Sequence, residues 1–192
     1  MDHFNDLASP AALLATRRSG KARDMAEPGP DAGQLAAILH AAARVPDHGK
    51  LFPWRFVVIE NRAAFADALM AAYLAAKPDA GRLERDAVTQ FAVQAPDLIV
   101  VIASPKSSHI PLWEQELSVG AACQNLVVAA HALGFVANWL TGWAAYDERV
   151  LALVGGVAPE RIAGFFFIGS QARPLEERPR PDLAAITSRW LG

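Results

Sequence analysis

The chain has 192 residues, of which 53% are hydrophobic and 20% are charged, and it carries a net charge of −2 at pH 7. This composition excludes a disordered protein, and the lack of excess positive charge argues against nucleic acid as the main partner. The length predicts one domain spanning residues 1–192.

Caps and apolar patterns predict the elements in chain order. Ser9 and Pro10 begin a helix that ends near Gly20, and Asp31 caps a second helix that Pro46 stops. The later expected elements are a strand over 54–60, helices over 62–76 and 80–93, a strand over 98–103, a helix over 112–133, a strand over 135–140, a short helix capped by Asp147, a strand over 163–169 and a short helix in the tail. Strands interspersed with helices in this way predict an α+β fold.

The segment from Leu117 to Leu140 contains no Asp, Glu, Lys or Arg. Gln124, Asn125 and Gly134 interrupt it, so we interpret it as a buried helix followed by a strand and expect no membrane association. A helix that is apolar all round must be buried all round, which favours a symmetric homodimer packed along it. A central helix of a monomer is the alternative that composition leaves open.

The amino terminus shows neither a basic region nor an apolar run, so no signal peptide is expected. Cys123 is the only cysteine and stands among small and apolar residues, which indicates a buried structural thiol. These features predict a cytoplasmic protein.

Familiar catalytic signatures are missing from the sequence. It contains no GxGxxG, no GxxxxGK[ST], no GxSxG and no HExxH. We therefore expect no metal site and no catalytic side chain, and the protein either binds without catalysis or takes its reactivity from a cofactor.

Polar and aromatic residues instead gather where elements end, which is where folds present groups to ligands. These are Arg17, Arg18 and Ser19; Arg44 and His48; Trp139, Leu140 and Thr141; and Arg173. Arginine with serine suits a phosphate dianion, but cations at the end of a helix also compensate the helix dipole, and spacing alone leaves the two interpretations even. A histidine in a loop and tryptophans at strand ends are commonly structural too.

At these same residues the sequence resembles the FMN-dependent nitroreductase family, and most of all its short bacterial members. The motifs are Arg17-Arg18-Ser19, Glu27-Pro28-Gly29-Pro30, the stretch from Arg44 to Trp54, the stretch from Trp113 to Gly120, the tryptophan leaving the third strand, and Phe165 to Gly169. Each motif is weak by itself, but their order and spacing extend from about Leu13 to Pro174.

The resemblance implies a central mixed or antiparallel sheet of about four or five strands flanked by helices, in an intertwined homodimer with two FMN sites at the interface. Carried over by position, Arg17, Arg18 and Ser19 would bind the FMN phosphate and ribityl chain. A second subunit would contribute Arg44 and His48. The isoalloxazine ring would be lined by Trp139, Leu140 and Thr141. Arg173 would be a weaker candidate for the phosphate.

The activity implied is transfer of a hydride from NAD(P)H through FMN to a nitroaromatic, a quinone or a similar small acceptor. Phe52 stands where many relatives have glutamine, Lys50 where several have a small polar residue, and Leu140-Thr141 where close relatives have a more polar pair. Three alternatives remain: a flavin-binding or sensing dimer without turnover, which Phe52 and Lys50 permit; a relative that fragments flavin or removes halogens; and a purely structural dimer in which the arginines cap helices.

Overall fold

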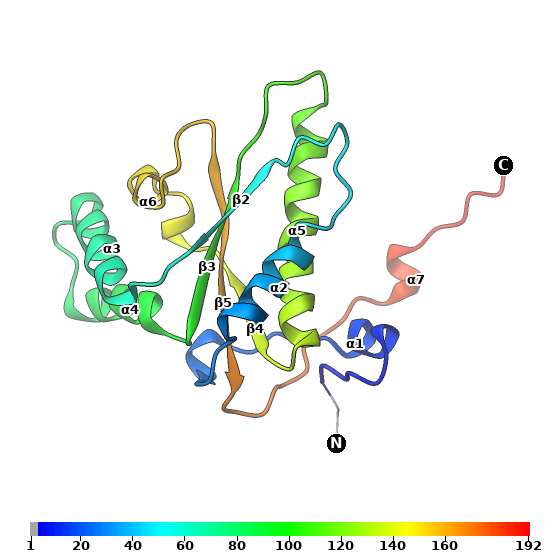
Figure 1. Cartoon of the computed structure of the whole chain (residues 1–192), viewed down its shortest axis with the longest axis horizontal. Coiled ribbons are helices and arrows are strands. Elements are labelled where there is room, and N and C mark those ends of the chain that lie inside the picture. Colours follow the sequence, from blue (N-terminus) through cyan, green and yellow to red (C-terminus); the bar gives the residue numbers. More distant parts are fainter. Residues whose placement is uncertain (1–3) are drawn as a thin grey trace.

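The computed structural model describes residues 4–192 and has five strands in one antiparallel sheet with helices on both faces (Figure 1). The strands are β1 (Met25–Ala26), β2 (Trp54–Val58), β3 (Asp97–Ala103), β4 (Val136–Leu140) and β5 (Arg161–Gln171). The helices are α1 (Pro10–Thr16), α2 (Ala32–Ala42), α3 (Arg62–Ala76), α4 (Arg82–Val93), α5 (Leu112–Ala132), α6 (Glu148–Leu153) and α7 (Leu183–Ile186). The α+β prediction and the flanked sheet are confirmed.

The strand β5 organises the sheet, because it hydrogen-bonds to three of the other four strands. It pairs with β3 through Leu98 and Phe167, with β4 through Trp139 and Phe166, and with β1 through Met25 and Gln171. These partners extend β5 by two residues at each end beyond the expected 163–169. The strand β1 was not expected, because two residues are too few to show an alternating pattern.

Side chains of β3 and β5 alternate between two cores, one on each face of the sheet. Val100 and Phe165 pack toward α3, α4 and α6, whereas Val101 and Phe166 pack toward α2 and α5. Residues 98–102 of β3 are fully buried, because the two cores cover both faces of this strand. Figure 1 shows the two layers, with α3, α4 and α6 on one side of the sheet and α2 and α5 on the other.

The helix α5 is buried on its inner side only. Ala122, Leu126 and Ala130 have no exposed surface, whereas Trp113 and Leu117 on the outer side are more than half exposed. The expectation of burial all round is thus wrong for a single chain, because the described residues leave the outer side of this helix uncovered. None of the helices between residues 4 and 192 has both the length and the hydropathy needed to cross a bilayer.

The helix α1 is shorter than expected. It ends at Thr16, and Arg17 has the backbone angles φ −53° and ψ 125°, which are extended rather than helical. Arg17, Arg18 and Ser19 therefore lie in the connection that follows the helix, and the last turn of α1 contains no basic residue. Compensation of the helix dipole consequently does not account for the two arginines.

Candidate functional site

The connection from Arg17 to Gly20, which we call the arginine turn, is held by the side chain of Asn5. Its Oδ1 accepts a hydrogen bond from the backbone N–H of Arg18 at 2.8 Å, and its Nδ2 donates to the carbonyl of Arg18 at 3.1 Å. Within the turn, Nη1 of Arg17 donates to Oγ of Ser19 at 3.2 Å. A guanidinium and a hydroxyl are thereby placed side by side, as an oxyanion of a phosphate requires.

The arginine turn is strongly cationic. Burial lowers the pKa of Arg17, and the positive charges of Arg180, Arg18 and Arg178 lower this pKa further. Glu177 is the acid that pairs with this group, through Nη2 of Arg180 at 3.1 Å. Four guanidinium groups with one carboxylate leave an excess of positive charge that a bound anion would offset.

The turn is joined to β4. Nδ2 of Asn138 donates to the carbonyl of Gly20, and a Cβ atom at Gly20 would lie 3.3 Å from the side chain of Val136. The turn therefore lies directly against the strand whose end carries Trp139, Leu140 and Thr141. The contacts of the turn are with Val136 and Asn138, and the cavity lined by Arg18 and Ser19 shares no residue with the cavity that Trp139 borders.

Beside this junction lies the fully buried ring of His131. Its Nε2 accepts a hydrogen bond from the backbone N–H of Ala137 at 3.2 Å. Burial lowers the pKa of His131 to about 4, and the charge of Arg17 lowers it further. The ring is therefore neutral at pH 7, and its proton resides on Nδ1.

Two buried polar atoms near the turn lack a hydrogen-bond partner among residues 4–192. They are Nδ1 of His131, a donor, and Oδ1 of Asn138, an acceptor. Buried polar groups are normally satisfied, so each of these atoms points to a bound ligand or to a water molecule.

Trp139 is fixed as a flat platform on β5. Its Nε1 donates to the carbonyl of Ala163 at 3.0 Å, and its ring stacks on Phe166 with centroids 5.2 Å apart. Gly164 permits this approach, because a Cβ atom there would lie 2.1 Å from Nε1 of Trp139. After Thr141 the chain turns at Gly142, whose φ of +80° favours glycine.

Trp139 borders an apolar cavity of about 300 Å³ next to α5. The cavity is also lined by Gly120, Cys123, Tyr146 and Ala163. Burial raises the pKa of the Cys123 thiol to about 12, so the prediction of a buried, unreactive cysteine is confirmed. In the described part of the chain, no three His, Cys, Asp or Glu side chains gather as a metal site.

Arg173 shares a cavity of about 270 Å³ with Arg18 and Ser19. Its side chain is 75% exposed, and its Nε lies 3.7 Å from the carboxylate of Asp24. The structure therefore places Arg173 near the arginine turn but in an ion pair of its own.

His48 lies far from the arginine turn within one chain, whereas the carbonyl of Arg44 accepts a hydrogen bond from Nδ2 of Asn125, further along α5, at 3.1 Å. Nδ1 of His48 is 2.6 Å from Oε2 of Glu114, which lies in the first turn of α5. The positive charge of Arg17 lowers the pKa of His131, which lies in the last turn of α5. Seventeen residues of α-helix separate Glu114 from His131, a distance of about 26 Å. One chain therefore does not bring these two groups onto one small ligand.

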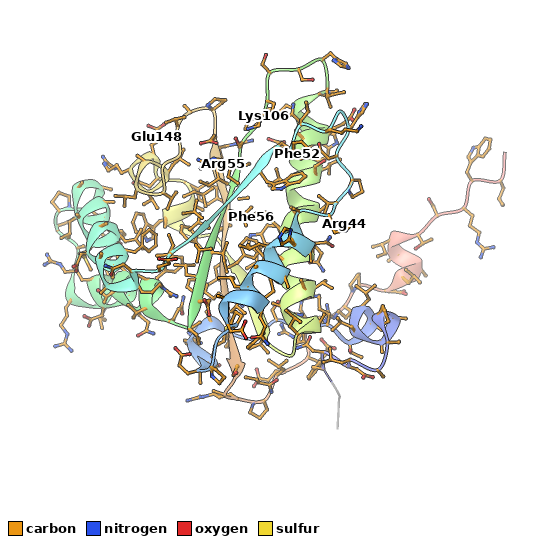
Figure 2. The ribbon with its side chains drawn as sticks, viewed as in Figure 1. Arg44, Phe52, Arg55, Phe56, Lys106 and Glu148 are labelled. Carbon is orange, nitrogen blue, oxygen red and sulfur yellow. The ribbon has the colours of Figure 1, made fainter. Side chains whose placement is uncertain are left out.

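The loop 43–53 runs along the first half of α5, and α1 lies beside the last turns of α5 (Figure 1). Lys50 and Phe52 have positive φ angles of 55° and 50°, and the backbone N–H of Phe52 donates to Asp47 at 2.8 Å. Phe52 packs edge-on against Trp54 and is 64% exposed. Figure 2 shows Phe52 near the start of β2, and Arg44 at the end of α2.

Three contributions were not expected from the sequence. Glu114 positions His48, Gly164 seats Trp139, and Arg178 and Arg180 add charge to the arginine turn. The alternation of arginine and proline in residues 178–181 was a visible signal for the last of these. The other two depend on pairing between distant segments.

Comparisons with known proteins identify the family. The family model described as "Nitroreductase family" matches residues 14–170. A protein of Escherichia coli K12 named "Putative NAD(P)H nitroreductase YdjA" is 37% identical over 179 residues, which cover 92% of this chain and 90% of that protein.

Solved structures share the fold. A nitroreductase-like family protein from Bacillus cereus superimposes with a TM-score of 0.80 at 21% identity, covering 100% of both chains. A nitroreductase with bound FMN from Bacteroides fragilis gives a TM-score of 0.71 at 22% identity, covering 94% of this chain and 98% of that one. Because the family model matches most of the chain and the Escherichia coli relative aligns along nearly its full length, the chain belongs to the nitroreductase family.

Proposed function

We propose that the chain is an FMN-dependent oxidoreductase that uses NAD(P)H to reduce nitroaromatic compounds, quinones or similar small acceptors. The observation that carries this proposal is the contact between the arginine turn and β4, where Asn138 bonds to Gly20. In this contact a phosphate-type donor set adjoins the strand that also carries the aromatic side chain of Trp139. Family membership supports the same conclusion.

The residues present fit the cofactor. Arg17, Arg18 and Ser19 supply two guanidinium groups and a hydroxyl for a phosphate, and the excess positive charge around them suits a dianion. The unsatisfied atoms of His131 and Asn138 offer one donor and one acceptor for a polyhydroxyl chain. Bound FMN would accept a hydride and pass electrons on in pairs, which is chemistry that this chain's side chains do not supply.

The chain's own residues would position the ligands and exclude water. Trp139 is held flat by its hydrogen bond to Ala163 and by Phe166, so it provides a rigid wall at low entropic cost. The cavity of about 300 Å³ beside it would receive the electron donor and the acceptor in turn. Successive use of one recess predicts ping-pong kinetics.

The site is completed by a second copy of the chain. His48 contacts α5 about 26 Å from the end of that helix at which Arg17 lies, and the outer side of α5 exposes Trp113 and Leu117. A symmetric homodimer packed along this helix would bring Arg44 and His48 of one subunit over the arginine turn of the other.

A visible spectrum of the purified protein, recorded before and after anaerobic addition of NAD(P)H, tests the proposal. We expect flavin absorbance that bleaches within seconds and returns when a quinone or a nitroaromatic compound is added. A protein that takes up no added FMN would overturn the proposal.

The same experiment separates the alternatives. Bound flavin that NAD(P)H does not reduce would indicate a sensing dimer, which the changed rim residues Lys50 and Phe52 permit. Loss of flavin, or halide release from a halogenated aromatic compound, would indicate the other flavin chemistries. The α3–α4 connection spans only residues 77–81, which leaves little room for a substrate lid there and favours small, general acceptors.

A further inference from the structure

We propose that the adenosine half of NAD(P)H binds in a second cavity, between α6 and the start of β5, and that Arg161 binds the diphosphate that joins the two halves of this donor. The inference rests on the proposed function, because it extends the site of the electron donor. It also predicts a preference for NADH over NADPH, which the name of the Escherichia coli relative, an NAD(P)H nitroreductase, leaves open.

The second cavity has a volume of about 420 Å³. Glu148 and Leu151 of α6 line one part of it, and Val157 and Ile162 line another part, where the chain passes from α6 into β5. Sites for small molecules typically enclose about 300–1,000 Å³. This cavity and the cavity of about 300 Å³ beside Trp139 are therefore each large enough for one half of a dinucleotide.

The two cavities adjoin, because four residues line both of them. These residues are Ala145, Tyr146, Arg161 and Ile162. Arg161 is the one with a charged side chain, and it lies at the boundary between the cavities. The nicotinamide and adenosine halves of NAD(P)H are joined by an anionic diphosphate. A dinucleotide that occupied both cavities would therefore carry its diphosphate past the guanidinium of Arg161.

Arg161 keeps hydrogen-bond donors for this diphosphate. Its Nη2 donates to Oε1 of Glu116, but a guanidinium has five N–H groups, so donors remain for phosphate oxygens. The side chain is 69% exposed, and an anion can reach it from solvent. Arginine is well suited to this task because its planar group binds phosphate through two parallel hydrogen bonds.

Tyr146 provides a surface on which adenine can stack. It lines both cavities, and the residue is 80% exposed. Bases stack on exposed aromatic side chains through their π faces. Leu151, Val157 and Ile162 add apolar surface to the second cavity. Apolar walls with a few polar groups are what a nucleoside site requires.

The charge of the second cavity favours NADH. Among its carboxylates, Asp147 pairs with Arg149, and Glu160 pairs with Arg55. Glu148, at the start of α6 (Figure 2), forms no ion pair within residues 4–192. An unpaired carboxylate can accept hydrogen bonds from the ribose hydroxyls of NADH, whereas it repels the 2′-phosphate of NADPH.

The first experiment measures the binding of ADP-ribose to the FMN-loaded full-length protein by calorimetry, since ADP-ribose has the adenosine and the diphosphate but no nicotinamide. Arg161→Gln should weaken this binding about 3- to 10-fold, because the guanidinium is partly exposed and contributes less than a buried charge-assisted hydrogen bond. Arg161→Lys should retain part of the affinity.

Two control variants accompany this measurement. Glu116→Gln breaks the same ion pair but keeps the guanidinium, so it should bind ADP-ribose at least as tightly as the wild type does. Arg82→Gln removes an exposed, acid-paired arginine on α4 and should leave the dissociation constant unchanged. Weakening by Glu116→Gln equal to that by Arg161→Gln would overturn the inference, because the ion pair rather than the guanidinium would then matter.

Steady-state kinetics with a quinone acceptor separates the two halves of the donor. Arg161→Gln should lower kcat/KM for NADH about 3- to 10-fold. The same substitution should not change kcat/KM for reduced nicotinamide riboside, which has no phosphate. Equal losses with both donors would overturn the inference, since they would place the effect of Arg161 on the nicotinamide half.

The donor preference has its own test. The wild type should have a higher kcat/KM for NADH than for NADPH, and Glu148→Gln should reduce this ratio about threefold or more. A wild type that prefers NADPH, or a ratio that Glu148→Gln leaves unchanged, would overturn the preference assigned to this cavity.

Failure of this inference is distinguishable from failure of the proposed function. If NADH bleaches the flavin but the protein binds no ADP-ribose, or binds it equally well as Arg161→Gln, the inference is overturned and the proposed function stands. If ADP-ribose binds in a manner that depends on Arg161 to a protein that takes up no FMN, the proposed function fails and the nucleotide site remains.

Discussion

Arg17 and His48 are associated with opposite ends of the same helix. His48 contacts Glu114 at 2.6 Å in the first turn of α5, and the charge of Arg17 acts on His131 in its last turn. A ligand that touches both residues must therefore lie between two copies of the chain.

Mixed dimers test this arrangement. Homodimers of Arg17→Ala and of His48→Ala should each bind FMN weakly. Mixed in equal amounts and reassembled, they should recover about a quarter of the wild-type sites, because half of the dimers are hybrid and each hybrid carries one intact site. Titration of the mixture with FMN counts the tight sites. Recovery of none would show that both residues serve the same subunit's site.

The phosphate assignment predicts the effects of single substitutions in the arginine turn. Arg17→Ala should weaken FMN binding roughly tenfold to a hundredfold, since a charge-assisted hydrogen bond contributes about 1.5–3 kcal/mol. Ser19→Ala removes a neutral hydroxyl and should weaken binding less. Flavin content after purification and the dissociation constant of FMN provide the measurement. An Arg17→Ala protein that keeps its full flavin content would contradict the assignment.

The lowered pKa of the buried His131 predicts a loss of folding stability in mild acid. Its pKa is about 4 in the folded protein and about 6.5 when unfolded, so below pH 6.5 the unfolded chain binds a proton that the folded ring does not. The free energy of unfolding should fall between pH 6.5 and pH 4, by roughly 3 kcal/mol in total. Urea unfolding at pH 7 and pH 4.5 measures it. His131→Gln should flatten this dependence, whereas His40→Gln, an exposed control on α2, should preserve it.

The pair of Arg55 and Glu160 predicts a second effect of acid. Nε and Nη2 of Arg55 each donate to the Glu160 carboxylate at 2.8 Å, and this hydrogen bonding lowers the pKa of Glu160 to about 2. The stabilisation should be complete above pH 4.5 and lost between pH 4.5 and pH 2. Glu160→Gln should cost about 1–2 kcal/mol at pH 7 in urea unfolding.

A solvent-exposed pair provides the comparison for Glu160. Arg82 and Asp86 are one helical turn apart at 3.6 Å, and both side chains are exposed. Asp86→Asn should cost no more than about 0.5 kcal/mol. Equal costs for Glu160→Gln and Asp86→Asn would indicate that the bidentate geometry contributes nothing extra.

Local signals in the sequence located most of the fold. The helix α3 matches its expected range of 62–76, because Asn61 caps it and its apolar positions repeat with helical spacing. The strand at 98–103 was recognised from its unbroken apolar residues. By contrast, β1 and the carboxy-terminal end of β5 arise from pairing between residues about 145 positions apart, as between Met25 and Gln171, and the other end of β5 from pairing of Arg161 with Ala103. No local pattern records such partners.

The site was predictable only in part. The sequence located the arginine turn and the end of β4 separately, and the structure joins them through Gly20 and Asn138. Residues whose role depends on a distant backbone, such as Gly164 beneath Trp139, carried no signal of their own. The composition of α5 does not specify which chain covers its outer side, which the described residues of one chain leave exposed.

The central position of β5 has a consequence for the order in which the molecule forms during synthesis. It is the last strand along the chain, yet β1, β3 and β4 all hydrogen-bond to it. Before Arg161–Gln171 leaves the ribosome, β2 and β3 are the only two of the five strands that can pair with each other. Each core then still lacks the phenylalanines of β5, which are Phe165 and Phe167 in one core and Phe166 in the other. The nascent protein must therefore remain without a complete sheet until synthesis has passed Gln171, the last residue of β5.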